Sequence, residues 1–188
     1  MKRFVLIIAL SGCCAVAFGQ IAQGKGLLTG SLRYSKTGEI DARYSVGVGG
    51  GYFVSDRSAV GLSFSFGKGT FTALDFLGSV SETLSIQLFS RYYVELGDEG
   101  KFFFFIQPSV THVKLSGSDY DGEDYEVQWN IVAVSPGFSF YPAPRVGIEL
   151  SVAGLSYAIS DNESSNTIDL DLSPASPTLS VTFLLGRE

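Results

Sequence analysis

From about residue 27 onward, the chain repeats one pattern in which every second residue is apolar and the residues between are mostly Gly, Ser, Thr or Gln. Alternation of this kind predicts β-strands with two different faces, because successive side chains of a strand point to opposite sides. No window carries the apolar spacing of an amphipathic helix. We therefore predict an all-β protein with strands at residues 27–35, 43–54, 60–67, 83–94, 101–113, 127–141, 146–157 and 178–185.

The connections between these segments alternate strictly between two kinds. Three are short and rich in turn-forming residues, at 55–58, 97–100 and 141–144, and four are longer and polar, at 36–41, 68–82, 115–126 and 158–177. This alternation predicts an antiparallel, up-and-down order with short turns at one end and long loops at the other. Outer-membrane barrels have this asymmetry, with short periplasmic turns and long extracellular loops.

The two faces of the strands have unusual chemistry. The polar face is small and nearly uncharged, and charged residues make up 17% of the chain, below the roughly 25% of typical soluble domains. This predicts an eight-stranded transmembrane β-barrel with its apolar face outward, toward lipid. After residue 20 no stretch approaches the ~18 apolar residues of a membrane helix. The alternative is a secreted lipocalin-like barrel with inverted faces, whose interior would bind a small apolar ligand.

The first residues form a separate segment. Lys2 and Arg3 precede an apolar run, and Ala17-Phe18-Gly19 offers small residues for cleavage before Gln20, so we predict a secretory signal peptide at 1–19 and a barrel domain at 20–188. In the alternative, Leu10–Cys13 is a lipobox and Cys13 is lipidated. Cleavage before Gln20 removes both cysteines and leaves 11 of the 13 basic residues against 19 acidic ones. An acidic chain without basic clusters argues against nucleic-acid binding.

A few large polar residues fall in the middle of strands on the small-residue face. We predict that they form a polar network inside the barrel, in which the buried Glu149 pairs with Arg91, Arg33 or both, because an unpaired charge is costly in a medium of low dielectric. Such a network plugs the interior; the alternative is a gate in a narrow channel for small solutes. The predicted network consists of Arg33, Gln87, Arg91, Gln107 and Glu149.

Aromatic residues lie near the ends of the apolar face. We predict that they form two girdles at the membrane interfaces. The girdle residues are Tyr34, Tyr44 and Phe66 at the loop end, and Tyr52, Tyr92, Phe102 and Phe140 at the turn end.

The sequence offers little that resembles a catalytic or metal site. The single histidine, His112, falls on the outward face, and position 114 is Lys rather than the Ser of a lipid deacylase. The acidic run 119–126 lacks the EF-hand spacing, which favours a solvated loop. We therefore expect no enzymatic activity, no cofactor and no metal.

The chain resembles the small outer-membrane β-barrel family of the OmpA/OmpX type. The resemblance covers residues 20–188 and rests on the Gly-rich segment 46–53, Arg91-Tyr92-Tyr93, Pro136-Gly137-Phe138 and Glu149. It implies an integral outer-membrane protein of a Gram-negative bacterium with a structural or surface-interaction role, in adhesion or envelope stability. The implied partners are outer-membrane lipid and lipopolysaccharide, the barrel-assembly machinery, and an extracellular partner that contacts the loops.

Overall fold

The computed structural model describes residues 21–37, 41–71, 79–97, 99–118, 124–152, 154–160, 167–170 and 177–186. The predicted signal peptide lies outside these residues. The described part of the chain contains no helix long and apolar enough to cross a membrane. Its strands are β1 (Gly26–Thr37), β2 (Asp41–Ser55), β3 (Ser58–Phe71), β4 (Ser79–Glu95), β5 (Phe102–Ser118), β6 (Asp124–Ala143), β7 (Val146–Ser151), β8 (Leu155–Ser160), β9 (Thr167–Leu170) and β10 (Thr178–Leu185).

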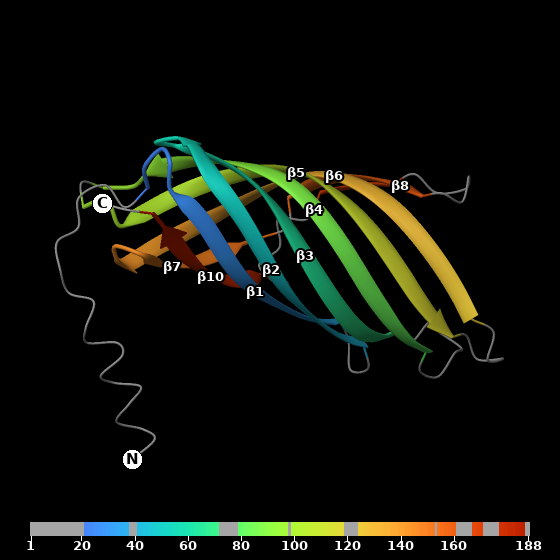
Figure 1. Ribbon diagram of the computed structural model, residues 1–188. Helices are drawn as coiled ribbons and strands as arrows, with labels where there is room; N and C mark the ends of the chain where they lie inside the picture. Colours follow the sequence, from blue (N-terminus) through green and yellow to red (C-terminus); the bar gives the residue numbers. More distant parts are fainter. Residues whose placement is uncertain are drawn as a thin grey trace, which may run out of the picture.

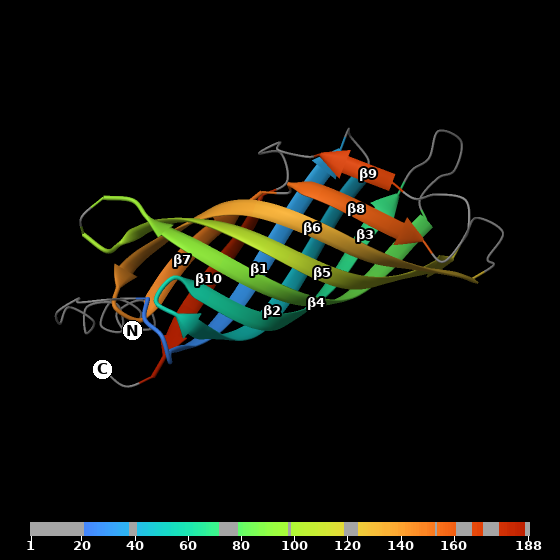
Figure 2. The ribbon, with the colours of Figure 1, turned by 90° about the horizontal axis from the view of Figure 1, so that it is seen from above.

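The strands close into a single antiparallel barrel (Figures 1 and 2). β1 to β6 pair in chain order, β6 pairs with β7, and β10 lies between β7 and β1. β8 and β9 extend the walls of β7 and β10 toward one end, so the wall has eight strands. This confirms the predicted all-β, up-and-down, eight-stranded fold. In the described residues the β1–β10 pairing ends at Arg33 and Thr178.

The registers give the barrel its shear. From Leu32, the register through β2–β5 leads to Gln128 on β6, whereas the register through β10 and β7 leads to Phe138 on the same strand. After one full turn around the barrel, the register is therefore displaced by ten residues along β6, and this displacement is the shear. A shear of this kind tilts the strands by about 35–45° to the barrel axis and leaves an interior just wide enough for side chains to fill.

The seventh wall strand contains a β-bulge. Between Phe138 and Val132 of β6 lie six residue steps, but their partners Leu150 of β7 and Tyr157 of β8 are seven steps apart. One extra residue in the seventh wall strand, formed by β7 and β8, reverses the inward and outward alternation of its side chains. Leu150 and Tyr157 are therefore both exposed on the outer face, although one residue number is even and the other is odd. Our prediction of one uninterrupted strand at 146–157 was wrong in this respect.

Gly154 lies at this bulge, and the backbone there leaves no room for a side chain. A Cβ at this position would collide with the carbonyl oxygen of Val134 on β6. We expect Gly154→Ala to lower the free energy of unfolding by about 1–3 kcal/mol, because overpacking forces the backbone to shift. Denaturant unfolding of the refolded barrel in lipid vesicles measures the change. Gly30→Ala is the matched control, since a Cβ on Gly30 meets no atom within 4 Å; an equal loss in both variants would contradict the steric explanation.

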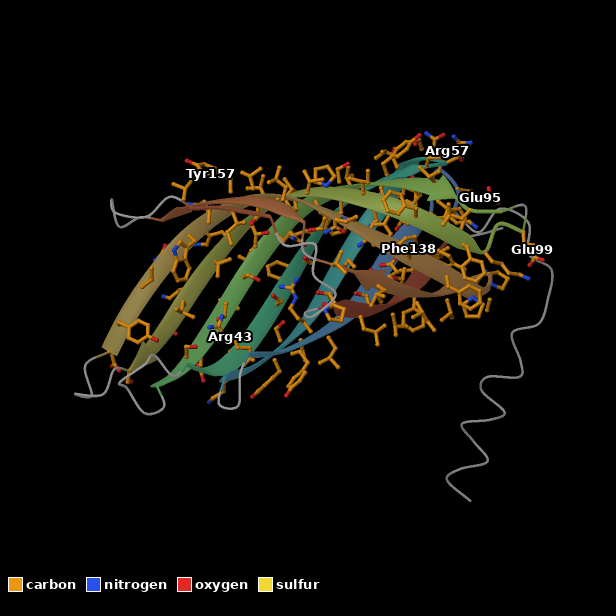
Figure 3. The ribbon with its side chains drawn as sticks, turned by 180° about the vertical axis from the view of Figure 1, so that it is seen from behind. Arg43, Arg57, Glu95, Glu99, Phe138 and Tyr157 are labelled. Carbon is orange, nitrogen blue, oxygen red and sulfur yellow. The ribbon has the colours of Figure 1, made fainter. Side chains whose placement is uncertain are left out.

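The two ends of the barrel differ as the sequence predicts, although several boundaries move. We call the end with Arg57, Glu95 and Glu99 the turn end and the opposite end, near Arg43, the loop end (Figure 3). At the turn end, residues 56–57 form a turn inside the predicted segment 55–58. The predicted segment 97–100 lies between β4 and β5, and Gly97 and Gly100 have left-handed φ values of 85° and 64°. The third turn falls at 144–145 rather than 141–144, because β6 continues to Ala143.

At the loop end the strands are longer than predicted. Lys68 on β3 and Glu82 on β4 are register partners joined by an ion pair of 3.2 Å, so the ladder continues into the segment 68–82 that we predicted as a loop. β5 reaches Ser118, and β9 lies within the predicted loop 158–177. The alternation of apolar and small residues ends before the hydrogen-bonded ladder does, because charged residues take over the outer face there. Residues 38–40, 72–78, 119–123, 161–166 and 171–176 lie outside the described part.

Candidate functional site

A buried ion pair lies inside the barrel, nearer its turn end. Arg91 of β4 and Glu149 of β7 have side-chain exposures of 8% and 1%, and Nη1 of the arginine donates to Oε2 of the glutamate over 2.7 Å. The same nitrogen donates to the hydroxyl of Tyr93 at 3.0 Å. Gln107 of β5 accepts from Nε at 2.9 Å and from Nη2 at 2.7 Å. The Tyr93 hydroxyl in turn donates to Oε1 of Glu149 at 3.5 Å. Each charge therefore has a hydrogen-bonding partner as well as its counter-ion, which a buried pair needs to offset its desolvation.

The network continues across the inner face toward the loop end. Nε2 of Gln107 donates to Oε1 of Gln87 at 3.4 Å, and Nε2 of Gln87 donates to the hydroxyl of Thr111 at 3.2 Å. Ser63 of β3 also donates to Gln87. The structure thus connects Gln87, Arg91, Gln107 and Glu149. Arg33 is separate from them: it is exposed, and its Nε donates to the hydroxyl of Thr178 on β10 at 2.9 Å.

Aromatic rings surround the Arg91 guanidinium, and our sequence analysis did not identify them. Its Cζ lies 4.4 Å from the ring centroid of Phe105, 5.4 Å from that of Phe89 and 5.7 Å from that of Tyr93. These distances suit cation–π attraction, which strengthens when the cation is desolvated. The ring of Tyr93 also packs against Phe53 at 5.7 Å and edge-on against Phe103 at 6.2 Å.

The turn-end half of the interior is therefore filled by aromatic and apolar side chains. The most buried hydrophobic residues among those described are Ile21, Leu27, Phe53, Ala59, Phe89, Tyr93, Phe103, Phe105, Tyr141 and Leu184. A signal for this filling exists in the sequence: residues 102–105 are four consecutive phenylalanines, so both faces of β5 are apolar at that level. Our sequence analysis placed Phe102 on the outer face and assigned no face to Phe103 and Phe105.

The outer face presents large apolar side chains on every wall strand. Leu88 is 61% exposed, Tyr34 is 56% exposed, and Tyr157 points away from the barrel (Figure 3). The residues predicted as girdles lie on this face. Tyr34 and Tyr44 are register partners near the loop end, and the rings of Phe102 and Phe140 stack at 4.5 Å at the turn end. Phe66 is on β3, Tyr52 on β2 and Tyr92 on β4, and all three are exposed.

Charged and polar residues also lie on the outer face of β3–β6. Nζ of Lys114 lies 2.7 Å from Oε2 of Glu126, which is in the same row of register partners as Lys68 and Glu82. Nδ1 of His112 lies 3.1 Å from Oδ1 of Asn130, its register partner on β6. Neither a hydroxyl nor a carboxylate is in hydrogen-bond contact with the imidazole in the described residues, so this contact does not form the base-and-nucleophile geometry of a hydrolase.

Comparison with known proteins identifies the fold. No family model and no curated protein sequence matches the chain. Among solved structures, it is similar to the N-terminal β-barrel domain of OprF from Pseudomonas aeruginosa, with 13% identity and a TM-score of 0.52 over 87% of this chain and 98% of the other. It is also similar to neisserial surface protein A, with 14% identity and a TM-score of 0.51 over 86% and 94%. The chain therefore has the fold of the small eight-stranded outer-membrane barrels, as the OmpA/OmpX resemblance implies.

Proposed function

We propose that this protein is an integral outer-membrane barrel with its turns in the periplasm and its loops at the cell surface. Its role is structural or surface-interacting, in adhesion or envelope stability, rather than enzymatic. The observation that carries the proposal is the outer face, where large apolar side chains are exposed on all wall strands at 38–61% of their surface. Monomeric soluble proteins rarely expose contiguous apolar patches beyond a few hundred Å², whereas a lipid-facing barrel requires such a belt.

The exposed aromatic side chains near both ends of the belt support the same proposal. Tyr and Trp favour the lipid–water interface because their rings combine an apolar body with a polar group. The lipocalin-like alternative requires the apolar face inside the barrel and the Gly and Ser face in water, which is the reverse of the exposure of these two faces. Outer-membrane lipid and lipopolysaccharide are then the proposed surroundings of the belt, the assembly machinery its proposed insertion partner, and an extracellular ligand the proposed partner of the loops.

The interior contacts support a plugged barrel rather than a pore. The pair of Arg91 and Glu149, together with the surrounding aromatic rings, fills the turn-end half of the interior. We expect no stable conductance from the purified barrel in planar bilayers. Reproducible single-channel steps would contradict the plug and favour the narrow-channel alternative.

Heat-modifiability combined with membrane fractionation tests the proposed location. We expect the protein in the outer-membrane fraction, and we expect its unboiled form to migrate at a different apparent size from the boiled form, because a closed barrel resists detergent. A variant with the adjacent glycines Gly49, Gly50 and Gly51 replaced by proline removes ladder donors and is the unfolded control. Recovery of the protein in the soluble periplasmic fraction would overturn the proposal and favour the lipocalin-like alternative.

Loss of the protein tests the proposed role. Cells without it are expected to become more sensitive to detergent or to adhere less to host surfaces, and a barrel with shortened loops is expected to restore detergent resistance but not adhesion. Unchanged detergent resistance and unchanged adhesion would contradict a structural or surface-interacting role, even if the protein is in the outer membrane.

A further inference from the structure

The inner face of the barrel is not uniformly polar toward the loop end. On β2–β4 it consists of Gly, Ser and Thr positions such as Gly47, Ser65 and Ser85. On β5 and β6 five of the inward positions are instead apolar, and they share this face with Thr111, Gly117 and Tyr125. The apolar ones on β5 lie on the same face as the buried Phe103 and Phe105, because side chains alternate along a strand. The apolar ones on β6 lie on that face because their register partners on β5 do. We call this set the inner apolar strip: Val113, Leu115, Val127, Trp129 and Ile131.

The strip is partly exposed although it faces inward. None of its five side chains is buried, in contrast to the aromatic rings at the turn end of the same strands. Val113 pairs with Trp129 and Leu115 pairs with Val127, so the strip is two strands wide, or about 5 Å between strand axes. From Val127 to Ile131 it is about 13 Å long at the rise of an extended strand. These dimensions suit a single acyl chain better than a lipid with several chains.

Two arginines lie on the inner face across the barrel from the strip. The successive cross-strand register partners of Arg33 are small residues on β2–β4 and then Leu115 on β5. The partners of Arg43 on β3 and β4 are Gly69 and Ser81. Figure 3 shows Arg43 near the loop end, on the inner side of the sheet. Among the inward side chains that the structure describes in this half, the charged ones are these two arginines. The bond from Arg33 to Thr178 orients its guanidinium.

The network of Gln87, Gln107 and Arg91 lies beneath this region, so a molecule that enters from the loop end meets a filled interior. We propose that the loop-end half of the interior binds a single-chain amphiphile with an anionic headgroup, such as a fatty-acid carboxylate. Its chain lies along the inner apolar strip and its headgroup meets Arg43 and Arg33. The positive charge of the two arginines favours an anionic headgroup over an alcohol of the same chain length. The width of the strip favours one acyl chain over a lipid with several chains. This binding requires the barrel fold but does not depend on the proposed role at the cell surface.

Trp129 makes the proposal directly measurable, because it is the single tryptophan of the chain and a member of the strip. The probe is brominated lauric acid, whose bromine quenches tryptophan at contact, added to the full barrel in lipid nanodiscs. We expect saturable quenching. The matched control moves the reporter outward by Trp129→Phe with Val132→Trp, since Val132 is exposed on the outer face. Linear quenching, equal for both reporters, would show partition into lipid alone and would overturn the proposal.

Two further variants separate the headgroup from the chain. Arg33→Gln with Arg43→Gln is expected to weaken brominated laurate about tenfold, the loss that corresponds to one charged hydrogen bond, and to leave the binding of brominated lauryl alcohol unchanged. Leu115→Ser is expected to weaken both probes. The heat-dependent gel shift shows whether each variant is folded. Equal binding of acid and alcohol to the native barrel would overturn the anionic headgroup.

Discussion

Replacing Glu149 with glutamine is expected to lower the free energy of unfolding by about 3–5 kcal/mol, because it leaves the buried Arg91 charge without its counter-ion. Both side chains are almost fully buried, and their contact is 2.7 Å long. Gln107 and Tyr93 hydrogen-bond the same guanidinium, but neutral acceptors do not replace a carboxylate in a medium of low dielectric. Urea or guanidinium unfolding in lipid vesicles, followed by the heat-dependent gel shift, measures the loss.

Two comparisons show whether this loss comes from the isolated charge. The double variant Arg91→Met with Glu149→Gln removes both charges and is expected to recover most of the stability, since apolar replacement of a buried pair is often neutral. Glu82→Gln breaks the exposed pair with Lys68, whose side chains are 42% and 51% exposed, and is expected to cost less than about 1 kcal/mol. If the double variant is no more stable than the single one, packing rather than charge explains the effect.

The parts of the structure that could be predicted from the sequence are those that depend on local alternation. Period-two patterning shows which residues share a face, and the alternating lengths of the connections show which ends meet. Together they predict the strand order, the apolar outer face and the inward position of Arg91 and Glu149. Their pairing could be predicted because a buried charge needs a counter-ion and the face offers few candidates.

Other features depend on pairing between strands and could not be predicted from alternation. The bulge between Leu150 and Tyr157 moves the seventh strand by one residue relative to β6, and this shift is visible only when these two residues are placed against their partners. The inner apolar strip was missed for a different reason. Alternation puts Val113 on the face of Thr111 and Trp129 on the face of Ala133, but our interpretation of that face as small and polar left these apolar residues unassigned.

The distribution of small and large residues along the strands explains why the two halves of the interior differ. At the turn end, rings of Phe and Tyr occupy the space that Gly61 and Gly137 leave: a Cβ on either would lie within 3 Å of the rings of Phe89 or Phe105. Small residues on one strand thus accept large residues from its neighbour, as close packing requires. Toward the loop end, small residues on β2–β4 face partly exposed apolar residues on β5–β6.

The second large loss of stability is expected from Leu88→Arg, which tests whether the apolar outer face contacts lipid. Leu88 lies near the middle of the outer face of β4 and is 61% exposed, so in water an arginine there would cost little. At the midplane of a bilayer, the same substitution costs about 2–4 kcal/mol. We therefore expect the variant to unfold at a clearly lower denaturant concentration in vesicles.

The matched controls vary depth and charge separately. Leu88→Ala removes apolar surface without adding charge and is expected to cost less than the arginine. Lys114 is a charged residue of the outer face that already pairs with Glu126, so Lys114→Arg keeps a charge where the sequence has one and is expected to change stability by less than about 1 kcal/mol. An arginine at position 88 that costs no more than alanine would mean that this face contacts water. The apolar side chains would then be unexplained by lipid, and the proposal of a lipid-facing belt would be overturned.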